Sequence, residues 1–247
     1  METVARVVRA VEFVAREGRV RLDDVAQELG VHKSNALRLL NTLRELDWMV
    51  LDDRRTYMVS PHLIAVGQAA AAGTSFQEAL QLAEDLRAMS GETVHIAVPH
   101  GQRMLIVGRV ESHNPLRVSC ELGTRDALHA SALGKAYLAA LTGDQLDSVV
   151  SRLDLDALTQ FSITDEAALR AEVARTKERG YSLDFEEGRV GVCCLGFSLR
   201  LGRNRDAVAL SITGPSYRWT REKMMTLVPA LLERVEAMNP SLALHPR

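Results

Sequence analysis

Apolar side chains in the first fifty residues follow the spacing of amphipathic helices. Between residues 4 and 15 they recur every three or four positions, which places them on one face of a helix that ends near Gly18. A second short helix, capped by Asp23, and a third, opened by Ser34, are separated by a turn at Gly30. The pattern therefore predicts a three-helix unit whose second and third helices form a helix-turn-helix.

A β-hairpin is expected after the third helix. Residues 48–51 and 56–59 are rich in β-prone side chains, and they flank the polar run 52–55. Three helices followed by a hairpin are typical of a winged helix-turn-helix, so we assign residues 1–60 to a DNA-binding domain of this type. These residues contain ten Lys/Arg and ten Asp/Glu, so the positive groups that reach phosphates must be placed locally.

The next segment is unusually poor in charge. Residues 60–73 contain no Asp, Glu, Lys or Arg and include an Ala-rich run. We expect a linker helix within residues 61–76. A helix with so little charge is seldom fully solvated, which predicts that it packs against a partner subunit.

Helical and strand-like patterns are mixed in the remaining residues, 77–247, which we assign to an effector-binding and oligomerisation domain. The fold class expected for the whole chain is α+β. The predicted strands are 93–98, 104–110, 116–120, 191–201 and 207–213, and the predicted helices are 77–89, 130–141, 166–179 and 221–238.

Composition narrows the class of protein. The chain has 247 residues, of which 47 % are hydrophobic and 25 % charged, and this suits two globular domains. No apolar run approaches the roughly 20 residues of a membrane span, and the N-terminus lacks the pattern of a secretory signal. The three cysteines are odd in number and two are adjacent, which is a poor basis for a disulfide framework. We therefore expect a cytoplasmic protein that does not interact with membranes.

The outward face of the third helix carries groups that suit DNA. Arg38 and Asn41 match base edges in the major groove, and Leu37 matches a thymine methyl group. The first residues of this helix lie where backbone N–H groups favour phosphate, and the hairpin tip lies where arginines reach the backbone or minor groove. The residues expected to contact DNA are Lys33, Ser34, Asn35, Leu37, Arg38, Asn41, Arg54 and Arg55. Alternatively, the domain contacts another protein and its arginines are solvated charges.

Four segments of the chain resemble the IclR family of bacterial transcriptional regulators. They are the helix-turn-helix around 33–43, residues 128–139 (LHASALGKAYLA), the region 179–194 that begins RGYSLDFEEG, and residues 209–215 (ALSITGP). The resemblance covers nearly the full length. It implies a ligand-responsive regulator of operator DNA, with a winged helix-turn-helix, a linker helix and a GAF-like antiparallel-sheet effector domain, assembled as a dimer or a dimer of dimers.

The resemblance also implies a small ligand, often a carboxylate, between the sheet and the helix 130–141. Helix N-termini bind anions through free N–H groups, and a serine hydroxyl adds another donor. Among the residues matched by motif, Asp184 suits a ligand hydroxyl. The residues expected to contact the effector are Ser131, Ala132, Leu133, Asp184, Cys194, Ser211 and Thr213.

Each polar residue in this set also has a structural interpretation. Ser131 can serve as a helix cap alone, Cys194 can be a small core residue, and the hydroxyls of strand residues can bond to the backbone. Lys135 either neutralises the ligand or a nearby carboxylate, or is solvated. The run 184–187 is expected to be mostly a solvated loop.

Three other kinds of function have weaker support. Cys194 and His129 could act as nucleophile and base, but no third residue orients them and no glycine-rich phosphate loop is present, so we expect no enzyme. The seven histidines are scattered, so we expect no metal and no cofactor. Redox sensing by Cys193 and Cys194 is a further alternative, although a vicinal disulfide is strained and an apolar strand raises a thiol's pKa.

Overall fold

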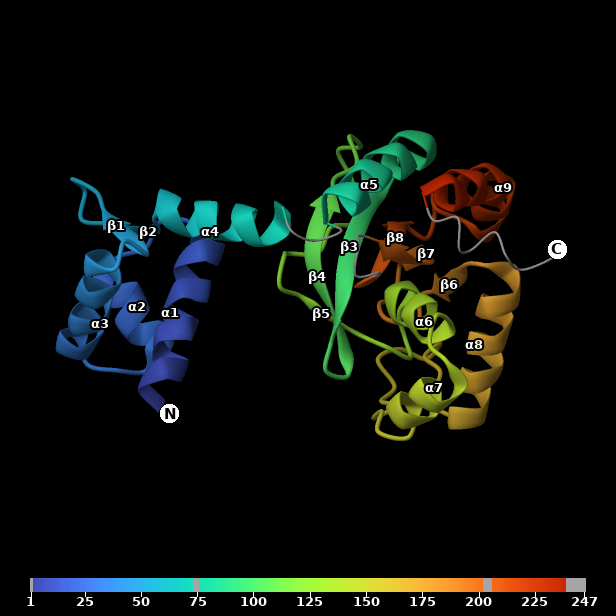
Figure 1. The fold of residues 1–247 in the computed structure, drawn as a ribbon, viewed down its shortest axis with the longest axis horizontal. Helices are drawn as coiled ribbons and strands as arrows, with labels where there is room; N and C mark the ends of the chain where they lie inside the picture. The colour runs from blue at the N-terminus through green and yellow to red at the C-terminus, as the bar shows by residue number, and fades with distance from the viewer. Residues whose placement is uncertain (1, 73–75, 202–205, 239–247) are drawn as a thin grey trace. The chain divides into compact units, whose positions relative to one another are not determined.

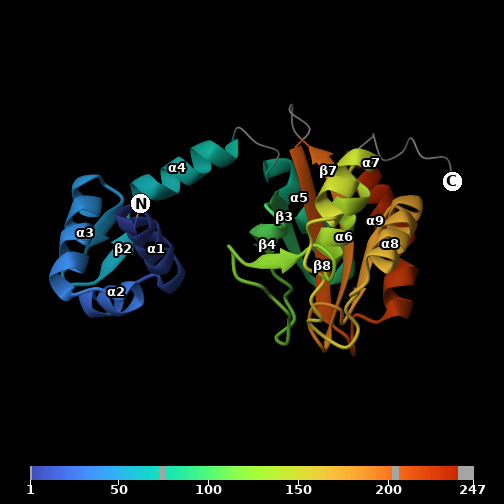
Figure 2. The ribbon, with the colours of Figure 1, turned by 90° about the horizontal axis from the view of Figure 1, so that it is seen from below.

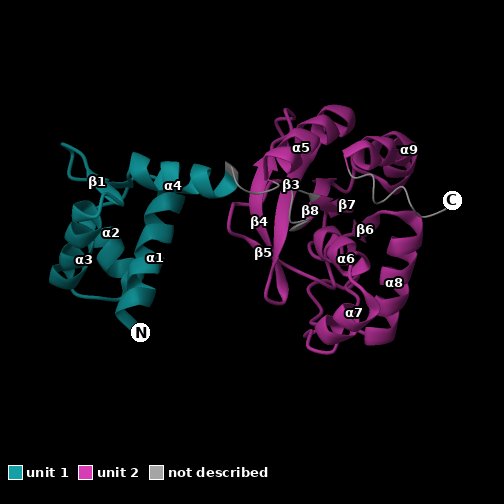
Figure 3. Cartoon of the chain, in the orientation of Figure 1, with its two compact units in different colours: residues 1–73 teal, residues 74–247 magenta. Residues whose placement is uncertain are grey.

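A computed structural model describes residues 2–72, 76–201 and 206–238. The chain divides into two compact units, Met1–Gly73 and Thr74–Arg247 (Figure 3). Residues 73–75, the last part of the expected linker segment, lie outside the described residues. No described helix combines the length and the apolar character of a membrane span.

The first unit contains the predicted three helices, hairpin and linker helix (Figure 1). Its elements are α1 (Glu2–Glu17), α2 (Leu22–Leu29), α3 (Lys33–Glu45), β1 (Met49–Leu51), β2 (Tyr57–Val59) and α4 (Pro61–Ala72). The apolar faces of α1, α2 and α3 meet in a core that includes Val14, Val25 and Leu40. Asp23 is not the N-cap of α2: the cap is Arg21, whose backbone N–H donates to the Asp24 carboxylate at 2.7 Å.

The second unit is built on a six-stranded sheet, so the expected α+β architecture is confirmed. All neighbouring strands are antiparallel, in the order β5-β4-β3-β8-β7-β6. The elements are α5 (Phe76–Ser90), β3 (Thr93–His100), β4 (Arg103–Val110), β5 (Arg125–Ala127), α6 (Ala132–Ala139), α7 (Gly143–Val150), α8 (Glu166–Arg179), β6 (Ser182–Phe185), β7 (Val192–Leu201), β8 (Asp206–Pro215) and α9 (Arg221–Met238).

Helices cover both faces of this sheet. Helices α5 and α9 lie on one face, while α6, α7 and α8 lie on the other (Figure 2). Because side chains alternate along a strand, Leu210 and Ile212 of β8 pack towards α5 and α9. The opposite face of the same strand then presents Ser211 and Thr213 towards α6. The polar side chains near α6 are therefore a consequence of strand alternation.

Two expectations for this unit are wrong. Residues 116–120 form no strand. At Cys120, side chains take the backbone hydrogen bonds, because the N–H donates to His95 and the C=O accepts from Arg109. The run 184–187 is not mostly a solvated loop, because Asp184 belongs to β6 and is buried. Edge strands as short as β5 and β6 carry too few residues for a periodic pattern.

Helix α6 lies very close to the sheet at Gly196. A Cβ added to Gly196 would lie 2.6 Å from the Ala132 carbonyl oxygen and closer still to Ser182 Oγ. That hydroxyl donates to the same carbonyl at 2.6 Å, which fixes the start of α6 on strands β6 and β7. Glycine at this position therefore sets the depth at which α6 sits.

We predict that Gly196→Ala lowers the free energy of unfolding by about 1–3 kcal/mol, because the added methyl group must push α6 away from the sheet. Urea denaturation of the full chain measures this change. The control is Gly67→Ala on α4, where an added Cβ meets nothing within 4 Å and alanine favours the helix. Equal stability of Gly196→Ala and the wild type would contradict the close contact.

Candidate functional site

The N-terminus of α3 is capped by His32 rather than by Ser34. The His32 carbonyl accepts from the N–H groups of Asn35 (2.9 Å) and Ala36 (3.2 Å), and its Nδ1 accepts from the N–H of Ser34 at 3.5 Å. Two of the N–H groups expected to favour phosphate, those of Ser34 and Asn35, are therefore already bonded. Any phosphate contact at this end of α3 depends largely on side chains.

The predicted side chains of α3 lie on its exposed face. Leu37 is 40 % exposed, and Arg38 is exposed with a guanidinium group that makes no hydrogen bond or ion pair with the described residues. Asn41 is half-buried, and its amide oxygen accepts from Arg44 at 3.3 Å. Lys33 Nζ lies 2.8 Å from an Asp23 carboxylate oxygen, but both side chains are more than 60 % exposed. Such surface pairs contribute little, so Lys33 can exchange this partner for a phosphate.

The hairpin tip is held by one carboxylate. Asp52 accepts from the N–H (2.8 Å) and hydroxyl (2.7 Å) of Thr56 and from the N–H of Arg54 (3.0 Å). The Thr56 hydrogen bonds, more than the nearby Arg19, hold the pKa of Asp52 below its usual value. Arg55 takes a left-handed φ of 58° in this turn. The side chains of Arg54 and Arg55 are exposed and have no described partner, so the tip presents two guanidinium groups.

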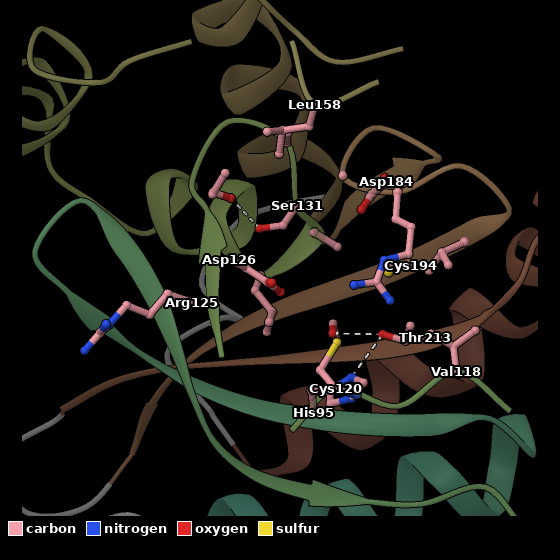
Figure 4. Close-up of a pocket in the computed structure, with 18 of the residues that line it drawn as sticks. His95, Val118, Cys120, Arg125, Asp126, Ser131, Leu158, Asp184, Cys194 and Thr213 are labelled. Carbon is pink, nitrogen blue, oxygen red and sulfur yellow. Dashed lines mark hydrogen bonds between the residues drawn. The ribbon is translucent and has the colours of Figure 1, made fainter. Parts of the chain in front are cut away.

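The second unit contains a cavity of about 150 Å³ between the sheet and the start of α6 (Figure 4). It is lined by all the residues predicted to contact an effector, which are Ser131, Ala132, Leu133, Asp184, Cys194, Ser211 and Thr213. Sequence reasoning missed six further polar residues of the lining: His95, Arg103, Cys120, Arg125, Asp126 and Arg189.

Strand register brings the polar residues of the cavity floor together. Cys194 of β7 pairs directly with Asp184 of β6 and with Thr213 of β8. Ser211 of β8 pairs with His95 of β3. Directly paired residues have Cβ atoms about 4.5–5.5 Å apart on the same face. Positions more than a hundred residues apart in the sequence therefore form one polar patch.

His95 organises the hydroxyl groups of this patch. The Cys120 N–H donates to His95 Nε2 at 3.0 Å, so the neutral ring carries its hydrogen on Nδ1 and donates to Thr213 Oγ1 at 3.2 Å. Burial lowers the pKa of His95 to about 4, which keeps the ring neutral at pH 7. Thr213 Oγ1 lies 3.3 Å from Ser211 Oγ and can donate to it. The Ser211 hydroxyl hydrogen is then available to a ligand.

Asp184 is buried beside this patch. Its Oδ1 accepts from the Glu187 N–H at 2.8 Å. Burial first, and then the negative charge of Glu187, raise the pKa of Asp184 to about 7, while Lys135 acts in the opposite direction. At neutral pH the carboxyl group is therefore partly protonated and can donate a hydrogen bond to a ligand.

Lys135 is neither solvated nor part of the cavity lining. It is fully buried, and its Nζ lies 2.5 and 2.6 Å from the two carboxylate oxygens of Glu187. Among the expected alternatives, neutralisation of a nearby carboxylate agrees with this geometry. The ion pair fixes the segment between β6 and β7, and from this segment Gly188 and Arg189 line the cavity.

The start of α6 offers donors that differ from the expected set. Ser131 Oγ donates to the Ala127 carbonyl at 2.6 Å and accepts from the Gly134 N–H at 3.0 Å, so its hydroxyl already serves as the helix cap. The N–H groups of Ala132 and Leu133 make no hydrogen bond with the described residues. These two N–H groups are therefore the donors that remain for an anion.

The geometry gives no support to a catalytic thiol, to redox sensing by Cys193 and Cys194, or to a metal site. Burial raises the pKa of Cys193 to about 11 and holds that of Cys194 well above its ordinary value, which makes both thiols poor nucleophiles. His129 bonds to the Asp156 carbonyl at 2.9 Å and is not among the residues that line the cavity with Cys194. Among the described residues, no group of three or more His, Cys, Asp or Glu is placed to hold a metal ion.

We predict that Asp184→Asn stabilises the protein at high pH. Because folding raises the pKa of Asp184 from 3.8 to about 7, ionisation costs stability as pH rises through this window. An asparagine can still accept from the Glu187 N–H but carries no charge. The variant should be more stable by about 1–3 kcal/mol at pH 8, and this difference should shrink towards pH 5.

Urea denaturation at several pH values measures this difference. The control is Asp154→Asn, the same substitution at an exposed aspartate that makes no described side-chain interaction. A stability difference for Asp184→Asn that is constant from pH 5 to pH 8 would contradict the raised pKa.

Separate family models match the two units of the chain. The family model for the C-terminal domain of bacterial IclR transcriptional regulators matches residues 74–239, and the model for the IclR helix-turn-helix domain matches residues 3–53. The acetate operon repressor of Salmonella typhimurium is 28 % identical over 232 residues, which cover 92 % of this chain and 85 % of the repressor.

Solved structures share the fold. The crystal structure of the Thermotoga maritima IclR has a TM-score of 0.80 at 24 % identity and covers 97 % of this chain and 98 % of its own. An IclR homologue from Microbacterium hydrocarbonoxydans, solved in complex with 4-hydroxybenzoate, has a TM-score of 0.76 at 20 % identity, with coverage of 96 % and 98 %.

Proposed function

Since the chain belongs to the IclR family of bacterial transcriptional regulators, we propose that its affinity for operator DNA is controlled by a small organic acid bound in the cavity beside α6. The observation that carries this proposal is the convergence of seven residues from α6, β6, β7 and β8 on one cavity. Those residues supply hydrogen-bond donors, and the one carboxyl group among them, that of Asp184, is partly protonated at neutral pH.

The size and chemistry of the cavity favour a small carboxylic acid. A cavity of roughly 150 Å³ can hold a benzene ring, so single-ring aromatic acids and short aliphatic acids are both compatible. The N–H groups of Ala132 and Leu133 and the hydroxyl of Ser211 can donate to a carboxylate, while Asp184 can pair with a hydroxyl group. The 4-hydroxybenzoate bound by the Microbacterium hydrocarbonoxydans homologue belongs to the same chemical class.

In the proposed DNA complex, α3 enters the major groove. Arg38 and Asn41 contact base edges and Leu37 a thymine methyl group, while Arg54 and Arg55 contact the backbone or minor groove. The side chains of Lys33, Ser34 and Asn35 contact phosphate. The exposed, unpaired guanidinium groups of α3 and of the hairpin tip support this arrangement.

We further propose that the protein acts in the cytoplasm as a homodimer or a dimer of dimers. None of the described side chains of α4 is buried within one chain, and Ile64 is 55 % and Val66 42 % exposed. A second copy of the chain can cover this apolar helix. Two recognition helices must lie about 34 Å apart to address one face of DNA, so a ligand-induced change of spacing would change affinity.

A mobility-shift titration tests the proposal as a whole. The full chain is titrated on DNA from just upstream of its own gene, at two salt concentrations, with and without a panel of aliphatic and aromatic acids. The proposal requires a salt-sensitive shift that at least one acid alters. A shift that no acid alters would refute the effector role, and the absence of any shift would refute the DNA-binding role.

We predict that Arg38→Ala weakens operator binding by about 1–3 kcal/mol, because a base-edge contact is lost. The control is Arg9→Ala, an exposed arginine on α1, a helix that packs against α2. Fluorescence anisotropy with operator and scrambled DNA separates sequence-specific binding from general affinity. Equal affinity of Arg38→Ala and Arg9→Ala for the operator would contradict base reading by Arg38.

We predict that Ser211→Ala weakens the response to the acid while operator binding without ligand is unchanged. Loss of one hydrogen bond to a charged group costs about 1.5–3 kcal/mol, so the acid concentration for half-maximal response should rise at least about tenfold. Ser148→Ala, on the exposed side of α7, is the control. Loss of DNA binding with a normal ligand response would contradict the assignment of Ser211.

A further inference from the structure

Unpaired arginines are concentrated at the cavity. Among the described arginines of the second unit, most are bonded to a carboxylate, a hydroxyl or a carbonyl oxygen, or lie over an aromatic ring. Four have a guanidinium group that makes no hydrogen bond, ion pair or ring contact within the described part of the chain: Arg87, Arg103, Arg125 and Arg189. Three of these four line the cavity.

Arg103 and Arg189 line the same cavity from different elements. Arg103 begins β4, and Arg189 lies between β6 and β7. Both are close enough to act on the charge of Asp126: burial raises the pKa of Asp126, while Arg189 and Arg103 act to lower it. Neither arginine lies within ion-pair distance of this carboxylate. In Figure 4, by contrast, the guanidinium group of Arg125 points away from the cavity.

The charges near the cavity do not cancel. Lys135 and Glu187 neutralise each other in a buried ion pair, and Asp184 is only partly ionised near neutral pH. Asp126 offsets at most one of the two convergent guanidinium groups. An excess of positive charge therefore remains in the cavity lining, on the exposed side chains of Arg103 and Arg189.

We propose that the effector is a carboxylic acid with a second anionic group, which binds between Arg103 and Arg189. This inference rests on the proposed effector role of the cavity and specifies the class of ligand. Guanidinium groups bind carboxylates and phosphates through paired, charge-assisted hydrogen bonds. Two arginines from separate elements that share one anion also tie the β6–β7 segment to β4 when the ligand is bound.

Calorimetric titration of the full chain with three matched acids tests this inference. Propionate carries one carboxylate, while succinate and 3-phosphonopropionate carry the same chain with a second carboxylate or a phosphonate. We expect at least one of the two dianions to bind at least about tenfold more tightly than propionate, because charge-assisted hydrogen bonds are added. The dianion that binds more tightly shows whether the second anionic group is a carboxylate or a phosphonate.

Substitution of the two arginines completes the test. Arg103→Ala and Arg189→Ala should each reduce affinity for the preferred dianion at least about tenfold and change affinity for propionate less than about threefold. Arg87→Ala, which removes an unpaired arginine outside the lining, should change neither.

If wild-type protein binds propionate as tightly as both dianions, or if Arg103→Ala and Arg189→Ala bind the dianion normally, the inference is wrong while the effector role stands. Binding of none of the three acids, together with no altered operator shift by any acid of the wider panel, overturns the effector role and the inference with it.

Discussion

The contact between the start of α6 and strand β7 determines whether the cavity exists. A glycine at position 196 lets the Ala132 carbonyl approach the sheet, and Ser182 holds it there with a hydrogen bond. Gly188 allows a similarly close approach to the Ala130 carbonyl from the β6–β7 segment. Since the backbone of α6 is fixed this closely, its first N–H groups face the polar residues of β7 and β8 across a small volume. A larger residue at either glycine would alter that volume before it altered any ligand contact.

The polar groups around the cavity carry a cost that apolar residues would avoid. A buried lysine and glutamate must compensate for the loss of their hydration, and replacement of such a pair by apolar residues is often neutral or stabilising. Lys135 and Glu187 lose their hydration in this way. Their ion pair fixes the segment from which Gly188 and Arg189 line the cavity. Asp184 and His95 are also buried, with a raised and a lowered pKa respectively. Perturbed ionisable groups gathered around one cavity are typical of a binding site rather than of a packing core.

The sequence predicted the fold and the lining residues on β6, β7 and β8, but it did not predict the roles of His95, Arg103 and Arg189. Strand alternation and helical periodicity are local signals, so they located β3, β4, β7, β8 and the long helices, and the motif resemblance located residues such as Ser211. His95 was missed because its role depends on Cys120, whose loop has no periodic pattern and was taken for a strand. Arg103 and Arg189 were missed because an unpaired arginine differs from a paired one only through its neighbours in space. The sequence left open whether Ser131 acts as a helix cap. Its two hydrogen bonds to backbone groups agree with that role.

The distribution of ion pairs explains how a chain with a formal net charge of −2 presents unpaired guanidinium groups in both of its units. Net charge averages over the surface, whereas binding depends on the charges that lack a partner at the site. Arg179, Arg218 and Arg234 are committed to carboxylates that hold helices and loops in place. Arg38, Arg54 and Arg55 on the first unit, and Arg103 and Arg189 on the second, have no such partner among the described residues. Because structural arginines are neutralised within the fold, an unpaired arginine that also lies at a cavity or on a recognition surface can pair with an external phosphate or carboxylate.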